Sequence, residues 1–289
     1  MNGVIRWSRW LSLSLMLVAG LGCRTTGPSA ASEREAQTQP AAQQESPHAA
    51  EATPPPAAME APSRPARRPN ALGPLAAHFA GLAPEGAQHM VVLLHGFGDR
   101  GDGLAMIARE LAASRPGLGV VALEGLLPHP QGGRMWWPID IARIQAARAS
   151  GGWPDLERQR SPGVDDARAA VVAALEELQA RGVPREHVTL AGFSQGAMLS
   201  VDVGLSHPEL LSAVVAWSGA ILDRAAWEQS APSGVRFTVV HGRRDTVLPF
   251  AQGEGLFTLV QRVDPRAVWV PFDGPHTVSA EGRAALLAS

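Results

Sequence analysis

Short apolar runs alternate with longer amphipathic segments along the chain from about residue 72 onward. The short runs are rich in Val, Leu and Ala, and they predict strands at Met90–Leu94, Gly119–Leu123, His187–Leu190, Ala213–Trp217, Val235–Val240 and Ala267–Pro271. Several of these runs are apolar throughout, which is typical of parallel strands that helices cover on both faces.

Segments with helical periodicity lie between these strands. They are Gly103–Ala113, Asp165–Arg181, Gln195–Ser206, Phe250–Arg262 and Ala280–Ala288. The segment 165–181 has the clearest pattern, because two aspartates stand at its start and a glycine follows its end. This alternation predicts an α/β fold with a mostly parallel central sheet, helices on both faces, and a site at the carboxyl ends of the strands.

Residues 1–23 have the pattern of an export signal. Arg6 and Arg9 precede an apolar stretch that is short for a permanent membrane span, and the single cysteine of the chain, Cys23, stands where the signal ends. This arrangement resembles the bacterial lipoprotein signal, in which such a cysteine is lipidated. We therefore expect a protein of the bacterial cell envelope, anchored to the outer membrane by a lipid at Cys23. A periplasmic or secreted protein with an incidental thiol is the alternative.

Residues 24–71 are expected to form a disordered tether. From Arg24 to Asn70 the chain contains no Val, Ile, Leu, Phe or Trp, while Ala, Gln, Ser, Glu and Pro dominate. Such a segment buries too little apolar surface to offset its chain entropy. The remaining residues, 72–289, have the length of one folded domain.

Charge and cysteine content exclude several classes of function. The chain has 25 basic and 27 acidic residues, a net charge of −2, so no broad positive field exists to bind nucleic acid. One cysteine excludes intramolecular disulfides and cysteine-based metal sites. Neither a metal-ligand spacing nor a phosphate-binding loop is present, so we expect no metal and no cofactor. Protein partners are not indicated by any feature of the sequence.

The stretch Gly192-Phe193-Ser194-Gln195-Gly196 contains G-x-S-x-G between an expected strand and an expected helix. Glycines at both ends permit a tight turn with a strained serine, which makes Ser194 a candidate nucleophile. The alternative is a small residue in a tight turn. The amide of Gln195 opens the helix and is a candidate oxyanion donor. An H-G-x-G segment after the first long strand offers the amide of Phe97 as a second donor.

A serine nucleophile needs a base and an orienting acid. His276 follows the last strand, and Asp245 lies just beyond the strand expected at 235–240, so the order Ser, Asp, His is that of the α/β-hydrolases. Asp273, three residues from His276, is a rival acid. His95 and His241 each precede a glycine at a strand end, where an imidazole more often satisfies backbone groups than performs catalysis.

Aromatic side chains near the middle of the chain are candidates for substrate binding. Met135, Trp136 and Trp137 lie in a loop bounded by Gly and Pro, where they would wall an apolar acyl or aryl pocket. Packing in the core is the alternative for the two tryptophans. Trp153, between Gly152 and Pro154, is a candidate lid residue on the same reasoning.

The motifs L-H-G-F-G-D, G-F-S-Q-G-A, H-G-R-R-D-T-V-L-P and G-P-H-T, in this order, resemble the phospholipase/carboxylesterase family of α/β-hydrolases. This family includes bacterial carboxylesterases and acyl-protein thioesterases. The resemblance runs from about Met90 to the C-terminus and implies that Ser194, Asp245 and His276 form the triad and that Phe97 and Gln195 supply the oxyanion hole. One departure is a proline before His276, where the family usually has glycine.

The resemblance implies a serine hydrolase that cleaves small carboxylic or thio-esters through a Ser-His-Asp triad and an acyl-enzyme intermediate. Acyl length and leaving group stay open, with a short-to-medium acyl ester as the default. One alternative is hydrolysis of another acyl bond by a peptidase, a feruloyl-type esterase or a polyester depolymerase. The other is a surface-anchored binding module, without catalysis, on a hydrolase scaffold.

Overall fold

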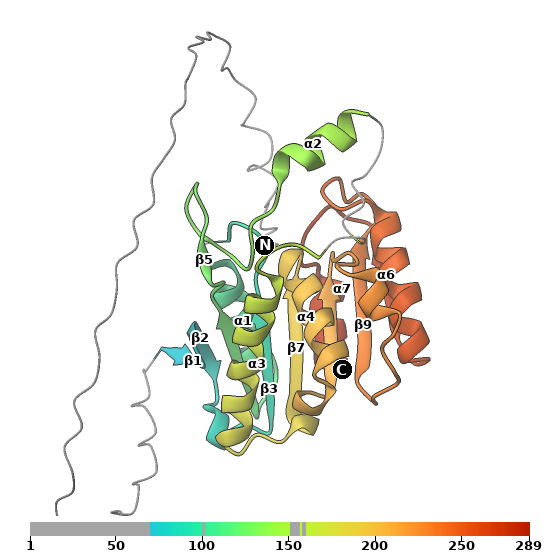
Figure 1. Cartoon of the computed structure of the whole chain (residues 1–289). Coiled ribbons are helices and arrows are strands. Elements are labelled where there is room, and N and C mark those ends of the chain that lie inside the picture. The colour runs from blue at the N-terminus through green and yellow to red at the C-terminus, as the bar shows by residue number, and fades with distance from the viewer. Residues whose placement is uncertain (1–69, 100–101, 151–156, 158–159) are drawn as a thin grey trace, which may run out of the picture. The chain divides into compact units, whose positions relative to one another are not determined.

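The computed structural model describes residues 70–99, 102–150, 157 and 160–289, and an eight-stranded sheet forms its centre (Figure 1). The strands follow one another across the sheet in the order β1-β2-β4-β3-β7-β8-β9-β10. Six of them are parallel: β3 (His89–Leu94), β4 (Leu118–Leu123), β7 (Val188–Phe193), β8 (Ala213–Trp217), β9 (Arg236–Gly242) and β10 (Val268–Phe272). These are the six strands expected from the sequence, so the mostly parallel α/β sheet is confirmed.

The sequence did not predict the remaining strands. β1 (Ala71–Leu72) and β2 (Leu75–Gly81) pair with each other and extend one edge of the sheet in antiparallel fashion, and β5 (Leu127–Pro128) and β6 (Arg134–Met135) form a separate ribbon. β2 contains mostly alanine and small residues and is exposed at four of its seven positions. β1, β5 and β6 are each two residues long, which is too short for a hydrophobic periodicity to be recognised in the sequence.

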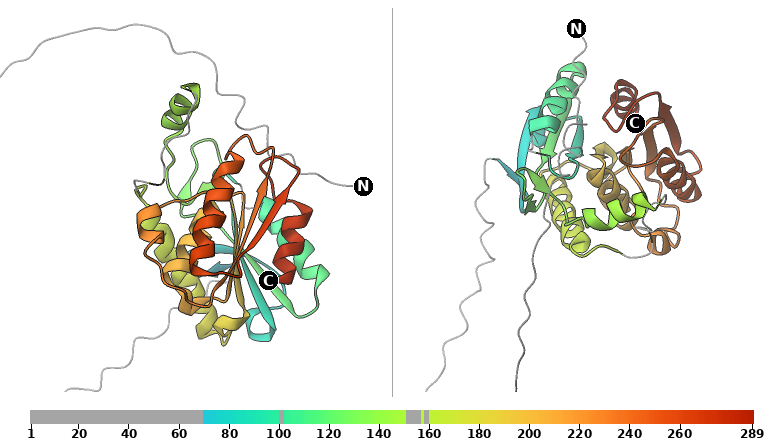
Figure 2. Two further views of the ribbon diagram at one scale, coloured as in Figure 1. Left: turned by 90° about the vertical axis from the view of Figure 1, so that its right-hand side faces the viewer. Right: turned by 90° about the horizontal axis from the view of Figure 1, so that it is seen from above.

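Helices cover both faces of the sheet (Figure 2). One face carries α3 (Val164–Ala180), α4 (Gln195–Ser206) and α6 (Phe250–Val263), and the other carries α1 (Asp102–Ser114) and α7 (Ala280–Ala288). All five were expected. Alternate side chains of the strands pack on opposite layers, as Val92 and Leu94 do on the α3–α4 side and Val91 and Leu93 on the α1 side. Single 3₁₀ turns lie at Pro84–Gly86, Arg185–His187 and Pro208–Leu210.

Two helices were not expected, α2 (Ile141–Ala149) and the short α5 (Arg224–Trp227). No residue of α2 is buried, so it lacks the apolar face that sequence analysis detects. The side chain of Asp140 caps its start by accepting the amide of Arg143 at 2.9 Å. Near its end the guanidinium of Arg148 donates to the carbonyl of Thr246 at 2.8 Å. The helix therefore contacts the loop that follows β9, at the carboxyl edge of the sheet (Figure 1).

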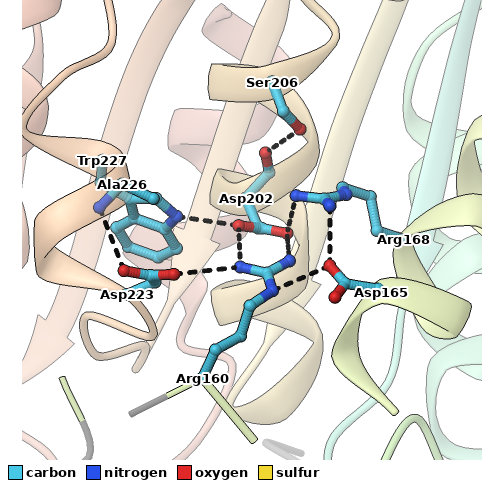
Figure 3. A network of polar contacts seen from close by, with 8 residues as sticks. All are labelled: Arg160, Asp165, Arg168, Asp202, Ser206, Asp223, Ala226 and Trp227. Carbon is cyan, nitrogen blue, oxygen red and sulfur yellow. Dashed lines mark hydrogen bonds and ion pairs between the residues drawn. The ribbon is translucent and has the colours of Figure 1, made fainter. Parts of the chain in front are cut away.

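An ionic network around the buried Asp202 ties Arg160 to three helices (Figure 3). Asp202 of α4 is 2% exposed, and its two carboxylate oxygens accept from the Arg160 guanidinium at 3.1 and 2.8 Å and from the Trp227 indole at 2.8 Å. Hydrogen bonding to Asp202 is the main reason that the pKa of Arg160 lies above its usual value. The other ionic members are Asp165, Arg168 and Asp223. The network fixes the chain entering α3 against the helix that follows Ser194.

Several predictions concern residues outside the described part of the chain. The export signal, Cys23, nearly all of the tether and Trp153 belong to this group, so these stay predictions. The first described strand, β1, begins one residue before the expected start of the domain at residue 72. Among the described helices, none is both long and apolar enough to cross a bilayer.

Candidate active site

Ser194 occupies the turn between β7 and α4 in a strained conformation, with φ 54° and ψ −112°. Such a backbone costs on the order of 1–3 kcal/mol and persists where its surroundings impose it. Neither flanking glycine tolerates a side chain, because a Cβ at Gly192 would collide with the carbonyl of Gly196, and one at Gly196 with the carbonyl of Leu94. The amide of Ser194 donates to the carbonyl of Trp217 at 2.9 Å, which holds the turn against β8.

His276 and Asp245 form a direct hydrogen bond between two loops at the carboxyl edge of the sheet. Nδ1 of His276 lies 2.6 Å from Oδ2 of Asp245. The other carboxylate oxygen accepts the amides of Val247 and Leu248, each at 2.8 Å, and the carboxylate is fully buried while 12% of the imidazole is exposed. Because two backbone donors hold Oδ1, the carboxylate has one orientation, with Oδ2 toward the imidazole.

The structure decides between the two candidate acids. Asp273 is exposed, and its carboxylate pairs with the guanidinium of Arg244 at 3.0 Å. Backbone amides of Arg243 and Arg244 donate to carbonyls of the histidine loop at 2.8 and 3.0 Å, and these bonds join the two loops. It is therefore Asp245, 31 residues before the histidine, and not its near neighbour Asp273, that contacts His276.

The imidazole of His276 lies beside the serine turn. The ring of Phe193, the residue before Ser194, packs against the imidazole of His276 with 4.7 Å between ring centroids. Ser194 itself is half-buried, so its side chain has access to solvent. The ends of β7, β9 and β10 thus gather a serine, a carboxylate and an imidazole that stand far apart in the sequence.

His95 and His241 satisfy buried polar groups, as the sequence indicated. Nδ1 of His95 donates to the carbonyl of the next residue at 2.7 Å and Nε2 accepts the amide of Gly125 at 2.8 Å, and burial lowers its pKa to about 4. His241 donates from Nε2 to the carbonyl of Leu248 at 2.9 Å, and burial lowers its pKa as well. The same nitrogen lies 3.4 Å from Oδ2 of Asp245. This contact between His241 and Asp245 was not predicted, although the four-residue spacing in H-G-R-R-D was visible in the sequence.

The H-G-x-G loop borders the serine. A Cβ built on Gly96 would lie 3.4 Å from Cβ of Ser194. Phe97 is half-buried, and its ring meets that of His129 edge-on at 4.7 Å. Within the described residues, the backbone amides of Phe97 and Gln195 donate to no protein group. Both candidate donors therefore lack a protein acceptor among the described residues, and they stand next to Ser194 in the chain and next to Gly96 beside it.

The aromatic segment before α2 is mostly part of the core. Trp136 and Trp137 are 0% and 2% exposed and belong to the main hydrophobic cluster. The structure therefore places both indoles in the packing role that the sequence left open, and not on the wall of a solvent-filled pocket. Met135, in β6, is half-buried and keeps accessible surface. Among the described residues, no group of three or more His, Cys, Asp or Glu side chains is arranged to hold a metal ion.

Comparison with known proteins identifies the family of this chain. A model of the phospholipase/carboxylesterase family matches residues 82–274. The chain belongs to the phospholipase/carboxylesterase family. This phospholipase/carboxylesterase is 28% identical over 180 residues to acyl-protein thioesterase 1 of Eremothecium gossypii, which covers 59% of this chain and 72% of that protein. It is 27% identical over 177 residues to the esterase YpfH of Escherichia coli, with coverages of 60% and 69%.

Solved structures agree with this assignment. The crystal structure of esterase PE8 superposes with a TM-score of 0.63 at 28% identity, over 74% of this chain and 96% of that one. A carboxylesterase from Mesorhizobium loti, at 20% identity and a TM-score of 0.58 over 74% and 95% of the two chains, shows the fold alone. The phospholipase/carboxylesterase described here is accordingly an α/β-hydrolase and a carboxylic ester hydrolase of the serine type.

Proposed function

We propose that this phospholipase/carboxylesterase hydrolyses carboxylic esters or thioesters through an acyl-enzyme intermediate on Ser194, with His276 as base and Asp245 as the orienting acid. The observation that carries the proposal is the hydrogen bond of 2.6 Å from His276 Nδ1 to Asp245, beside a serine held at a φ of 54°. With Nδ1–H donated to the carboxylate, Nε2 is free to accept the proton of the serine hydroxyl.

The cycle has two acyl-transfer steps. Ser194 Oγ attacks the carbonyl carbon while its proton passes to His276, and the amides of Phe97 and Gln195 hold the oxyanion. The C–O or C–S bond breaks, and the imidazolium returns the proton to the leaving alcohol or thiol. Water, deprotonated by His276, then attacks the acyl-serine, which releases the carboxylic acid and regenerates the hydroxyl.

Labelling with a fluorophosphonate followed by peptide mapping tests the nucleophile. We expect the label on Ser194, and no label and no hydrolysis of p-nitrophenyl butyrate after Ser194→Ala. Ser206→Ala, at the end of the helix that follows Ser194, is a matched control, since that hydroxyl donates within the helix to the Asp202 carbonyl at 2.6 Å. It should keep both label and turnover. An unlabelled parent protein would favour the non-catalytic binding module, and an active Ser194→Ala variant would exclude the triad.

An ester substrate is supported by the name of the esterase relative, and a thioester by the names of the acyl-protein thioesterases. Parallel assays on p-nitrophenyl esters of two to twelve carbons, acyl thioesters and peptide anilides separate these classes. We expect turnover of esters and thioesters and none of anilides. A preference for anilides would instead favour a peptidase. A preference for feruloyl esters or polyesters would favour a feruloyl-type esterase or a polyester depolymerase.

We also propose that the enzyme is exported and held in the cell envelope by a lipid on Cys23, for which the signal-like pattern of residues 1–23 is the support. The full chain expressed in a Gram-negative host should incorporate labelled palmitate and sediment with outer membranes. Cys23→Ser should remove the label and release the protein into the periplasm. Equal fractionation of both proteins without label would indicate an ordinary secretory signal.

A further inference from the structure

The carboxamide of Gln195 has no part in the acyl-transfer steps, which use the backbone amide of that residue. It is nevertheless 1% exposed, and both its oxygen and its nitrogen have a hydrogen-bond partner. Its Oε1 accepts the amide of Trp136 at 2.9 Å, and its Nε2 donates to the carbonyl of Trp137 at 2.8 Å. The side chain that follows the nucleophile therefore fastens a chain segment almost sixty residues earlier in the sequence.

That segment in turn reaches the loop of the second oxyanion donor. The indole Nε1 of Trp136 donates to the carbonyl of His95 at 2.9 Å, and the two rings lie 5.3 Å apart. His95 bonds through Nδ1 to the carbonyl of Gly96, immediately before Phe97. A continuous path of buried hydrogen bonds thus runs from Gln195 through Trp136 and His95 to the peptide that carries the Phe97 amide.

Further bonds hold the same two segments together. The amide of Gly98 donates to the carbonyl of Arg134 at 2.9 Å, and the amide of Arg134 donates to the carbonyl of Asp99 at 2.6 Å. The Arg134 guanidinium donates to the carbonyls of Gly125 and Leu126, each at 2.8 Å. The segment 125–137 is thus held to the H-G-x-G loop by several hydrogen bonds, and the Gln195 side chain connects this segment to helix α4.

Two amides stabilise one oxyanion only if both lie about 2.7–3.1 Å from the same oxygen. One amide is carried by α4 and the other by the loop after β3, so their separation is set by noncovalent contacts. We propose that the Gln195 carboxamide is a positioning group that couples the two oxyanion donors, acting through the Trp136 indole and the His95 carbonyl. This inference rests on the proposed acyl-enzyme mechanism of the preceding section.

The test uses Gln195→Met, which keeps the backbone amide and the chain length and removes both polar contacts. We expect kcat on p-nitrophenyl butyrate to fall by about 10- to 100-fold, less than the loss of a whole oxyanion donor, with KM within about twofold. The inhibition constant of an alkyl trifluoromethyl ketone, which forms a tetrahedral adduct on serine, should rise by a similar factor. If Gln195 had only a structural role, the inhibition constant would not rise by the factor by which kcat falls.

Trp136→Phe tests the path, since it keeps an aromatic ring and removes the indole N–H. We expect a smaller fall in kcat, about three- to tenfold. The double variant Gln195→Met/Trp136→Phe should have a kcat within about twofold of that of Gln195→Met, because both changes interrupt the same path. Asp264→Leu is the control. Asp264 is 3% exposed and accepts the amides of Phe237 and Arg266 near the start of β9, so its loss also strips a buried polar contact but should leave kcat unchanged.

Three outcomes would overturn the inference: an unchanged ketone constant in Gln195→Met, single effects that multiply in the double variant, or an equal loss of kcat in Asp264→Leu. Each is distinguishable from failure of the proposed function. A parent enzyme that fluorophosphonate does not label, or whose turnover survives Ser194→Ala, refutes the mechanism itself. If the parent enzyme is labelled and Ser194→Ala is inactive, the mechanism holds, and the Gln195 and Trp136 variants then test the role of the carboxamide alone.

Discussion

Asp245→Asn should inactivate the enzyme by fixing the wrong tautomer of His276. The amides of Val247 and Leu248 both donate to Oδ1 of Asp245, so an asparagine there must place its carbonyl oxygen at that position. Its NH₂ group then faces Nδ1 of His276 at the present distance of 2.6 Å. The imidazole meets a donor and must carry its proton on Nε2, where it is unable to accept the proton of Ser194.

The expected loss in kcat is about 10⁴-fold near neutral pH, which corresponds to about 5.4 kcal/mol of transition-state stabilisation. Stability should change little, because the asparagine preserves the shape of the side chain and both contacts from the backbone. The assay is steady-state hydrolysis of p-nitrophenyl butyrate, together with the rate of fluorophosphonate labelling, which should fall by a similar factor because it needs the same proton acceptor.

Asp273→Asn is the matched control. Its carboxylate is 76% exposed and pairs with Arg244, so we expect a change in kcat of less than about twofold. The reasoning is refuted if Asp245→Asn retains activity within tenfold of the parent enzyme. It is also refuted if Asp273→Asn suffers the larger loss, since the acid that orients the imidazole would then be the other carboxylate.

Three further predictions concern stability, measured by urea unfolding. Ser194→Gly should exceed Ser194→Ala in unfolding free energy by about 1 kcal/mol, because glycine relieves the backbone strain at φ 54°; equal values would argue against strain. Asp202→Leu should cost about 3–5 kcal/mol by leaving Arg160 without its buried partner, against less than about 1 kcal/mol for Asp165→Ala at the exposed end of the network. Burial lowers the pKa of His95 to about 4, so the unfolded chain binds more protons between pH 6.5 and 4 and stability must fall on acidification through that window. His95 accounts for about 2 kcal/mol of the fall in unfolding free energy between pH 7 and pH 5, and His95→Asn should make that fall smaller by this amount.

Much of the candidate site was predictable because its signals are local. The G-x-S-x-G turn is encoded in five consecutive residues, and the structure shows why, since any side chain at Gly192 or Gly196 would strike a neighbouring carbonyl. Asp245 and His276 each follow a strand directly, and parallel strands bring their carboxyl ends to one edge. The position of each residue along the chain was therefore enough to predict that both belong to the site.

Other features had no local signal. Helix α2 buries none of its residues, and the β1, β5 and β6 strands are two residues long, so no hydrophobic period marked them. The indoles of Trp136 and Trp137 looked equally suited to a pocket wall and to the core, because composition does not reveal which side of a loop faces inward. Their burial depends on neighbours contributed by distant strands and helices.

The sequence by itself determined the alternation of strands and helices, the serine turn and the order of the chemical groups, since these depend on residues that are adjacent or periodic. Tertiary structure alone decided that Asp202 anchors Arg160 and that the Gln195 carboxamide binds the Trp136–Trp137 segment, and it added the direct contact of Asp245 with His276 to what the sequence had predicted. The physical reason is the same in each case. A buried polar group must find a partner, and the partner comes from whichever distant segment the packing of the sheet and its helices brings within hydrogen-bond distance.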